Sequence, residues 1–436
     1  MTIVSQSTPS GFSAIAVIRL SGSSAIKISK KISKDYRPLK HRIAEVRNVF
    51  SGKDLIDQAV FTAFLSPNSY TGEDVVEISC HGNVHICETT INEIINLGAR
   101  IAEPGEYTKR AFINKKLNLL QAESVIQLIN ARSIEAVKQQ TKNLSGGATI
   151  KIQELKESLI SNLAYLEYEL DVSEDNYINK RALNKVKTNI KSNLETTDLL
   201  LNTFIQGSAL SYGIRLVFIG KPNVGKSTLV NKLVGLEKSI TSSVPGTTRD
   251  IVSTETIIGG VPVTLIDTAG IHPSENKIEM EGIKRSYEEI EAADLIINLF
   301  CHDSEVVDIV GERDQIFVYN KIDFMPYKGK SKKVFPISAK TGKGLTELFE
   351  HIEEKVSFVR VNAAEPLLTT IRQKEAMGNV SSCLSNALKH LENNSMEIEL
   401  PAEEIKNAII NVDLFTGKTT TNDVLDRVFS TFCVGK

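Results

Sequence analysis

An eight-residue segment, GKPNVGKS from Gly220 to Ser227, constrains the fold of this chain more than any other feature. It matches the pattern G-x-x-x-x-G-K-[ST] and lies between an apolar run, IRLVFI, and a helix-like run, STLVNKLV. This context predicts a strand, a phosphate-binding loop and a helix. Glycines let backbone N–H groups surround phosphates, and the N-terminus of the helix adds positive potential. We expect Lys226 to contact the β- and γ-phosphates and the Ser227 hydroxyl to ligate Mg²⁺.

Two later segments extend the predicted phosphate site. DTAG, from Asp267 to Gly270, ends the apolar run VTLI. We expect Asp267 to hold Mg²⁺ through water and the Gly270 N–H to sense the γ-phosphate. GTTRD, from Gly246 to Asp250, lies between the P-loop and DTAG. Its Thr248 is the expected second Mg²⁺ ligand, in a loop that orders when a triphosphate binds.

Two more motifs predict the site for the base. NKID at 320–323 follows the run QIFVY, and SAK at 338–340 follows KKVFPI. The Asp323 carboxylate can accept hydrogen bonds from N1–H and the 2-amino group of guanine, whereas adenine lacks both donors. We expect the stem of Lys321 to lie along the ring and the N–H of Ala339 to face guanine O6. The residues expected to contact GTP are Asn223, Val224, Gly225, Lys226, Ser227, Thr228, Ser242, Ser243, Val244, Pro245, Gly246, Thr247, Thr248, Asp267, Thr268, Ala269, Gly270, Asn320, Lys321, Asp323, Ser338, Ala339 and Lys340.

The distribution of apolar runs predicts several domains, since 436 residues are too many for one ordinary domain. Residues 1–117 combine β-like runs with an amphipathic helix and predict an α+β domain. From 213 to 362, near-continuous apolar runs alternate with helices, as in parallel strands buried on both faces. Residues 118–212 and 363–436 are helical in pattern. We therefore predict a helical-bundle domain interrupted by an inserted Ras-like P-loop GTPase domain with a mostly parallel sheet.

The first helical part contains few residues that end helices. It lacks proline, and its glycines, Gly146, Gly147 and Gly207, fall where we expect breaks between helices. The run LLQAESVIQLINARSIEAVKQQTKNL reads as one long helical pattern.

Composition limits the compartment and the partners. The formal net charge of −2 gives no overall positive field, so an RNA contact would need a local basic patch. The five scattered cysteines favour a reducing compartment over a disulfide framework. The sequence has neither a signal-peptide pattern at its start nor an apolar run of about 18 residues. We expect a cytoplasmic protein that makes no contact with membranes.

Four segments outside the predicted GTPase domain resemble the MnmE (TrmE) family of tRNA-modification GTPases. They are AVIRLSG at 16–22, YTGEDVVEISCHG at 70–82, PGEYTKRAFINKKLNLLQAES at 104–124 and the terminal FCVGK. The resemblance covers essentially the whole chain. It implies that the protein works with the flavoprotein MnmG (GidA) to add a carboxymethylaminomethyl or aminomethyl group to carbon 5 of the wobble uridine of certain tRNAs. The carbon would come from a tetrahydrofolate derivative, either 5-formyl- or 5,10-methylene-tetrahydrofolate.

The resemblance also implies a folate site. The family positions that contact folate correspond to Arg19, Glu77, Lys116 and Lys436. A pterin presents an amide-and-amine edge to a carboxylate, and a folate tail presents carboxylates to cations. Cys433 lies near Lys436 in the sequence, and two interpretations stay open for it: a functional thiol with thiolate character, or a small apolar helix residue.

The predicted GTPase lacks a common catalytic group. Many small GTPases place Gln directly after DTAG to orient the attacking water, whereas this chain has Ile271. The resemblance instead implies Glu279 as the carboxylate that reaches this water through a second one. Lys226 is the other residue for which we expect a catalytic role.

The resemblance further implies that K⁺ takes the place of an arginine finger. The matching ligand positions are Asn223, Ser242, Val244 and Thr247, with Ser242 in place of the family's usual Thr. A monovalent cation between the α- and γ-phosphates would neutralise charge that develops in the transition state. In the family two GTPase domains pair across a homodimer to form this site, so we expect a homodimer.

A function from a different class is also compatible with the GTP motifs. A GTP-gated assembly or scaffold factor, for example in ribosome biogenesis, would share these motifs and carry no modification chemistry. The folate positions and the FCVGK ending favour the tRNA-modifying interpretation.

Overall fold

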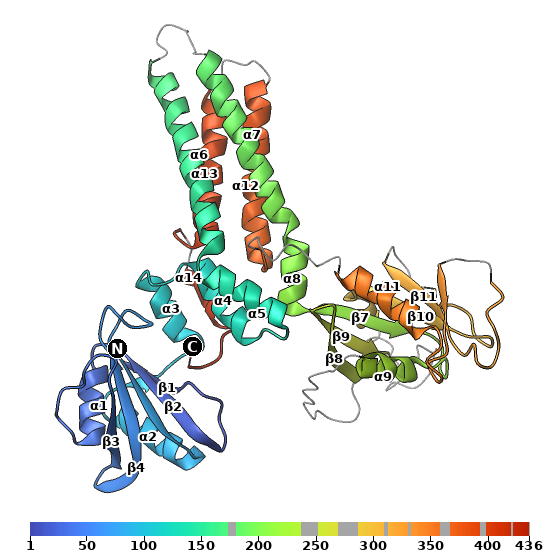
Figure 1. Ribbon diagram of the computed structural model, residues 1–436. Helices are drawn as coiled ribbons and strands as arrows, with labels where there is room; N and C mark the ends of the chain where they lie inside the picture. Colours follow the sequence, from blue (N-terminus) through green and yellow to red (C-terminus); the bar gives the residue numbers. More distant parts are fainter. Residues whose placement is uncertain are drawn as a thin grey trace. The chain divides into compact units, whose positions relative to one another are not determined.

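The computed structural model describes residues 1–172, 180–236, 252–268, 287–308, 313–329, 333–357, 367–392, 398–419 and 422–435. The chain forms two compact units (Figure 1). The first unit comprises Met1–Ile126, Asn143–Asn193 and Asn379–Lys436, and the second comprises Gln127–Lys142 and Leu194–Gly378. Among the helices of the described ranges, none has the length and apolar character needed to cross a membrane.

The first unit begins with a six-stranded sheet whose strand order is β3-β4-β5-β2-β1-β6. Its strands are β1 (Ile3–Gln6), β2 (Ser13–Ser21), β3 (Ala44–Ser51), β4 (Asp54–Phe64), β5 (Val75–Gly82) and β6 (Arg100–Ile101). Neighbouring strands are antiparallel, except that β6 runs parallel to β1. Helices α1 (Ala25–Ser33) and α2 (Val84–Asn96) pack on the sheet. Their buried Ile28 and Ile94 share one core with Ile18 of β2.

The register between β2 and β5 places two charged residues opposite each other. Arg19 pairs with Glu77, and the preceding pair in the register is Ile18 with Ile78. Successive side chains of a strand point to opposite faces of a sheet. Because Ile18 and Ile78 point into the core, Arg19 and Glu77 share the opposite face.

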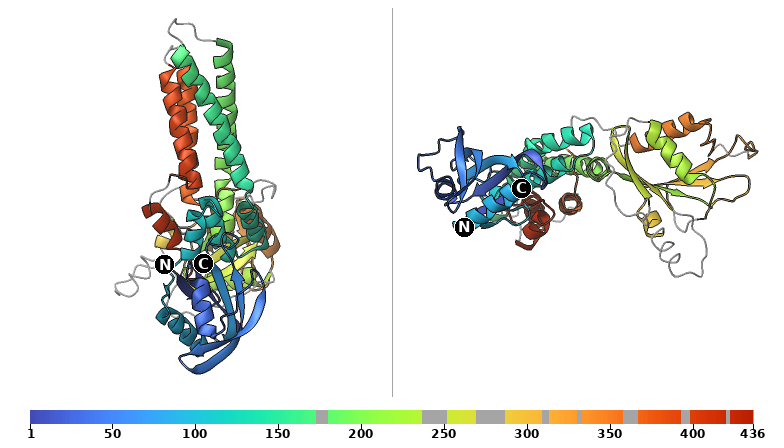
Figure 2. Two further views of the ribbon diagram at one scale, coloured as in Figure 1. Left: turned by 90° about the vertical axis from the view of Figure 1, so that its left-hand side faces the viewer. Right: turned by 90° about the horizontal axis from the view of Figure 1, so that it is seen from below.

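Long helices from two distant parts of the sequence lie side by side, for most of their length in the first unit (Figures 1 and 2). They are α6 (Gly147–Val172), α7 (Lys180–Asn202), α12 (Ile371–Glu392) and α13 (Glu399–Thr416). An ion pair of 2.5 Å between Lys156 and Asp413 joins α6 to α13. Lys187 and Glu392 join α7 to α12 at 3.8 Å. The two helical parts of the sequence therefore form one bundle, as expected.

The C-terminal segment packs against the N-terminal part of the same unit. The rings of Phe112 in α3 (Glu106–Ile113) and Phe429 in α14 (Asn422–Phe429) have centroids 6.4 Å apart. Gly105, directly before α3, adopts φ +67°, and a Cβ there would lie 2.6 Å from the Phe429 carbonyl oxygen. Only glycine combines this backbone angle with so close an approach.

The second unit contains the predicted parallel sheet, with strand order β12-β11-β10-β7-β9-β8. Its strands are β7 (Ile214–Ile219), β8 (Val252–Ile258), β9 (Val261–Asp267), β10 (Leu295–Phe300), β11 (Gln315–Tyr319) and β12 (Val334–Pro336). Only β8, which is antiparallel to β9, departs from the parallel direction among these strands. Leu216 and Phe218 pack on helices α9 (Lys226–Leu236) and α11 (Leu345–Ser357). Val217 packs on the opposite face with residues that include Ile290, so both faces are buried.

One long helical pattern of the sequence is broken in the structure. Residues 119–144 form two helices, α4 (Leu119–Ile129) and α5 (Ile134–Leu144). The buried hydroxyl of Ser133 accepts a hydrogen bond of 3.2 Å from the Ala136 backbone N–H. A serine in this position satisfies a free N–H at the start of a helix, and it therefore favours a new helix over continuation of the first.

The predicted break at Gly146 is confirmed, and the one at Gly207 is wrong. Gly146 has φ +96° and directly precedes α6. Gly207 lies inside α8 (Phe204–Tyr212). A Cβ at Gly207 would lie 2.0 Å from the Leu368 carbonyl oxygen, so glycine is present for close packing.

Candidate functional site

The predicted phosphate loop runs from the end of β7 to the start of α9, as its pattern required. Gly225 has φ +98°, and a Cβ there would lie 2.4 Å from the Asn320 side-chain nitrogen. Asn223 adopts φ +61°, a left-handed value that costs an ordinary residue about 1–2 kcal/mol and that Asn tolerates better than most. The loop therefore depends on these residue types for its shape.

Lys226 lies inside this loop. Its ammonium group donates hydrogen bonds to the carbonyl oxygens of Gly220 at 2.9 Å and Lys221 at 3.3 Å, and the residue is only 7% exposed. Burial lowers the pKa of Lys226, and the nearby Asp267 carboxylate opposes that effect. A phosphate would give this buried cation an anionic partner in place of neutral carbonyls.

The residues expected at the Mg²⁺ site come together. The Ser227 hydroxyl donates a hydrogen bond of 2.5 Å to Asp267 Oδ2. The other oxygen, Asp267 Oδ1, is buried and accepts no hydrogen bond from the residues that the structure describes. Next to it, the buried Thr268 hydroxyl donates to the Phe218 carbonyl at 2.7 Å and fixes the end of β9. A hydroxyl beside a carboxylate with one unpaired oxygen fits the hard, oxygen-preferring Mg²⁺.

The base motifs are joined to the phosphate loop by Asn320. Its side-chain nitrogen donates to the Val224 carbonyl at 2.8 Å, and its side-chain oxygen accepts from the Ala339 N–H at 2.9 Å. The Ser338 hydroxyl donates to Asp323 at 2.6 Å, and this bond lowers the pKa of the Asp323 carboxyl. Asp323 is therefore ionised and oriented, as recognition of two guanine donors requires.

These residues surround a cavity of about 450 Å³ beside the phosphate loop. This volume is within the usual range for small-molecule sites. The described residues that line it are Asn223, Gly225, Thr228, His302, Asn320, Lys321, Asp323, Phe324, Ala339 and Lys340. The residues expected to contact GTP include all of these except His302 and Phe324.

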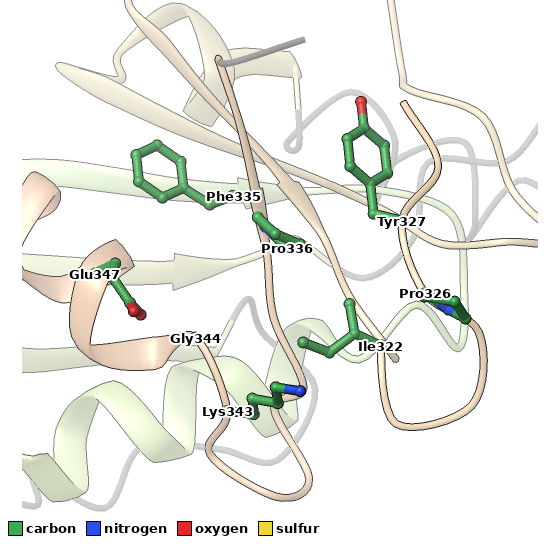
Figure 3. A pocket seen from close by; sticks show the side chains of 8 residues that line it. All are labelled: Ile322, Pro326, Tyr327, Phe335, Pro336, Lys343, Gly344 and Glu347. Carbon is green, nitrogen blue, oxygen red and sulfur yellow. The ribbon is translucent and has the colours of Figure 1, made fainter. Parts of the chain in front are cut away.

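A second cavity, of about 530 Å³, is lined by residues in and near the NKID and SAK segments (Figure 3). Ile322, the variable residue of NKID, lines it together with Phe335 and Lys343. Figure 3 shows the Tyr327 hydroxyl pointing away from Ile322. None of the side chains predicted to contact GTP is among the described residues that line this second cavity.

The N-terminal site is built around an ion pair. The Arg19 guanidinium donates two hydrogen bonds, of 2.9 and 2.8 Å, to one carboxylate oxygen of Glu77. Tyr70 and Tyr107 place their rings 6.0 and 5.7 Å from this guanidinium. The Gly435 carbonyl accepts a further hydrogen bond of 3.2 Å from Arg19. The structure thus brings the C-terminal tail to two of the predicted folate residues.

Lys116 and Cys433 are placed by other contacts. The Lys116 ammonium donates to the Pro67 carbonyl at 2.9 Å, and its stem lies near Gly72. Cys433 is exposed and follows the end of α14. Its carbonyl accepts from the Gly105 N–H at 3.4 Å. The interpretation of Cys433 as an apolar helix residue is therefore wrong, because the helix has already ended at Phe429.

Several predicted residues fall outside the described part of the chain. They are Ser242, Ser243, Val244, Pro245, Gly246, Thr247, Thr248, Ala269, Gly270, Ile271, Glu279 and Lys436.

Sequence reasoning missed four aromatic residues at these sites. Tyr70 and Tyr107 lie within the segments YTGED and PGEYTK, which could have indicated them. Phe324 directly follows NKID. His302 had no signal in the sequence, because the turn after β10 brings it to the base motifs.

The loop, the Ser227–Asp267 pair and the oriented Asp323 define a P-loop protein of the guanine-nucleotide class. Comparison with protein-family models agrees. Residues 2–116 match the model described as GTP-binding protein TrmE N-terminus, and residues 119–433 match the MnmE helical domain.

Curated relatives match the whole chain. The tRNA modification GTPase MnmE of Francisella philomiragia is 38% identical and aligns with 100% of this chain and 99% of its own length. The MnmE of Fervidobacterium nodosum is 36% identical, and the alignment covers 100% of this chain and 97% of the relative. The MnmE of Thermotoga maritima is 34% identical, and the alignment covers 100% of both chains. The chain belongs to the MnmE family of tRNA modification GTPases, and it is a GTP hydrolase.

Solved structures match over part of the chain. Era of Aquifex aeolicus bound to GDP·AlF4⁻ is 24% identical, covers 39% of this chain and 66% of its own, and has a TM-score of 0.26. The FeoB G-domain of Methanococcus jannaschii is also 24% identical, and its TM-score is also 0.26. The match covers 33% of this chain and 98% of the FeoB chain. Scores this low add nothing to the assignment.

Proposed function

We propose that this protein couples GTP hydrolysis to modification of the wobble uridine of certain tRNAs, together with the flavoprotein MnmG. The observation that carries the proposal is the Ser227–Asp267 pair, whose second carboxylate oxygen has no partner among the described residues, together with the cavity that Asp323 helps to line. This site lies in a chain whose relatives align with it from end to end. Family membership favours this function over a GTP-gated assembly factor.

In this proposal, Lys226 and Ser227 position the triphosphate. The Lys226 ammonium exchanges the carbonyls of Gly220 and Lys221 for β- and γ-phosphate oxygens, and Asp323 holds the guanine edge. Ser227, Asp267 and Thr248 would hold Mg²⁺, which would neutralise phosphate charge when bound. Glu279 orients the attacking water. Lys226 lowers the barrier by stabilising negative charge that grows on the γ-phosphate oxygens.

K⁺ is the proposed substitute for an arginine finger. Asn223, Ser242, Val244 and Thr247 would hold it, and it would supply positive charge near the transferred phosphoryl group. Asn223 supports this role because it lines the cavity beside the phosphate loop, where its left-handed backbone angle is one that Asn tolerates. Residues on a second copy of the GTPase domain would complete the site, so the protein acts as a homodimer.

The folate derivative, either 5-formyl- or 5,10-methylene-tetrahydrofolate, is proposed to bind at Arg19, Glu77, Lys116 and Lys436. Glu77 would accept from the amide-and-amine edge of the pterin, and the cations would hold the carboxylates of the tail. The Arg19–Glu77 pair fits this group, since each side chain is partly exposed, at 15% and 28%, and retains hydrogen-bonding capacity. The exposed Cys433 near this tail is a candidate functional thiol.

This function belongs to a four-part organisation of the chain. Residues 1–117 form the folate-binding and dimerisation domain, and residues 118–212 and 363–436 form the helical domain. Residues 213–362 form the inserted GTPase domain. We propose that the protein works in the cytoplasm, where tRNA and MnmG meet it.

Hydrolysis rates in different salts test the proposed mechanism. The kcat for GTP should be at least about tenfold higher in K⁺ than in Na⁺, because a fitted cation replaces a charged side chain in stabilising the transition state. The substitution Asn223→Ala should remove that difference. A steady-state phosphate-release assay at equal ionic strength measures both. Equal rates for the wild-type protein in the two salts would contradict the K⁺ assignment.

A further inference from the structure

Two of the residues that line the cavity beside the guanine motifs are aromatic and lie outside every motif. His302 and Phe324 line it, and their ring centroids are 5.0 Å apart with an angle of 41° between the planes. Such tilted contacts are favourable between aromatic rings. Phe324 directly follows Asp323, so one edge of the ring pair is adjacent to the carboxylate expected to bind guanine.

A turn with several hydrogen bonds holds His302 in this wall. The Ser304 N–H donates to the Cys301 carbonyl at 3.0 Å, and the Cys301 N–H donates to the Ser304 hydroxyl oxygen at 2.9 Å. The Cys301 thiol, which is buried, contacts the Asp303 carboxylate at 2.8 Å. Only 22% of the His302 side chain is exposed. Although His302 as a whole residue is exposed, most of its imidazole is covered, and the residue lines the cavity.

We propose that His302 is a nucleotide-contact residue and that it forms, with Phe324, an aromatic cover for the guanine base. This proposal rests on the proposed placement of guanine against Asp323. A ring on the base removes one face of it from water, and the lower local dielectric strengthens the hydrogen bonds to Asp323. Every base offers a π face to such a ring, so the cover sets how long a nucleotide stays bound. Choice of guanine over adenine remains with Asp323.

Release of a fluorescent nucleotide tests the cover. We expect His302→Ala to increase the dissociation rate of N-methylanthraniloyl-GDP from the full chain by roughly 5- to 150-fold, because this range corresponds to the loss of one stacking contact between a base and an aromatic side chain. His302→Phe keeps an aromatic ring and should release the nucleotide within about threefold of the wild-type rate. Stopped-flow fluorescence measures the three rates.

The chain offers a matched control in His351. This histidine also lies on a phenylalanine, with its ring 4.9 Å from that of Phe335, but Phe335 lines the second cavity. His351→Ala removes an equivalent ring contact from the same unit and should leave nucleotide release unchanged. If His351→Ala accelerates release as much as His302→Ala, the effect is a general loss of stability and the cover is refuted.

The substitution Asp323→Asn separates the cover from the guanine site on which it rests. An Asn amide can donate to the 2-oxo group of xanthine, so this variant should prefer xanthine over guanine nucleotides. If the preference changes and His302→Ala releases nucleotide at the wild-type rate, the cover fails and the guanine site stands. If Asp323→Asn still prefers guanine, both fail. If His302→Ala and His302→Phe increased the nucleotide dissociation rate equally, the proposal would also be overturned, because an aromatic ring at this position would then not hold the base by stacking.

Discussion

Two carboxylates of this protein, Asp267 and Glu106, differ in how their oxygens are paired. Asp267 keeps one oxygen unpaired at the proposed Mg²⁺ site, whereas Glu106 in the first unit is fully paired. Burial alone would raise the pKa of Glu106. Hydrogen bonds from Arg100, from the Glu103 backbone N–H and from Arg110 outweigh burial and lower this pKa from 4.5 to about 2. Asp267 therefore keeps an oxygen that can bind a metal ion, whereas the paired carboxylate of Glu106 stabilises the fold.

The lowered pKa of Glu106 predicts an acid-sensitive first unit. A carboxyl with a depressed folded-state pKa stabilises the fold above its unfolded value, and this contribution is lost as the pH falls toward the folded value. Between pH 4.5 and about 2, the first unit should lose roughly 3 kcal/mol of stability through this group. Urea unfolding followed by circular dichroism over this pH interval measures the loss.

The substitution Glu106→Gln provides the control for that measurement. It removes the titrating group and keeps the shape of the side chain. The variant should therefore be less stable at neutral pH and should show a shallower dependence of stability on pH below 4.5. An unchanged pH dependence would show that other carboxyl groups cause the acid sensitivity.

At the scale of elements, two helical glycines of this chain differ in how closely other residues pack against them. Gly207 in α8 faces the Leu368 carbonyl oxygen, which a Cβ would approach to 2.0 Å. Gly378 in α12 has open space, with nothing within 4 Å of the Cβ position. The sequence pattern does not separate these cases, because Gly207 and Leu368 are far apart in the chain and meet only in the folded unit.

The two helical glycines predict opposite effects of the same substitution. Gly207→Ala should destabilise the second unit by about 1–3 kcal/mol, since the backbone at Leu368 must move. Gly378→Ala should stabilise its helix by about 0.5–1 kcal/mol, because alanine has the higher helix propensity. Thermal unfolding of both variants compares them directly. A Gly207→Ala protein as stable as the wild type would mean that Leu368 does not approach α8 so closely in solution.

At the scale of the whole molecule, the sequence predicted the site residues that lie in contiguous motifs. It did not predict the contacts between segments that are far apart in the chain. The phosphate loop, Asp267 and Asp323 were predictable because each lies at the end of a parallel strand, and such ends meet at one edge of the sheet. The hydrogen bonds of the Asn320 side chain with Val224 and Ala339 link three separate segments of the chain. His302 depends on a turn that has no motif. These contacts could not be predicted from spacing alone.

We propose that a guanine-nucleotide cycle in the inserted domain drives modification of the wobble uridine. Mass spectrometry of nucleosides from tRNA tests it in cells that lack the chromosomal copy of this protein. A plasmid copy of the wild-type sequence should restore the modified wobble uridine, and an Asp323→Asn copy expressed to the same level should not. Unchanged modification in the deletion strain, or full restoration by Asp323→Asn without xanthine nucleotides, would contradict this coupling.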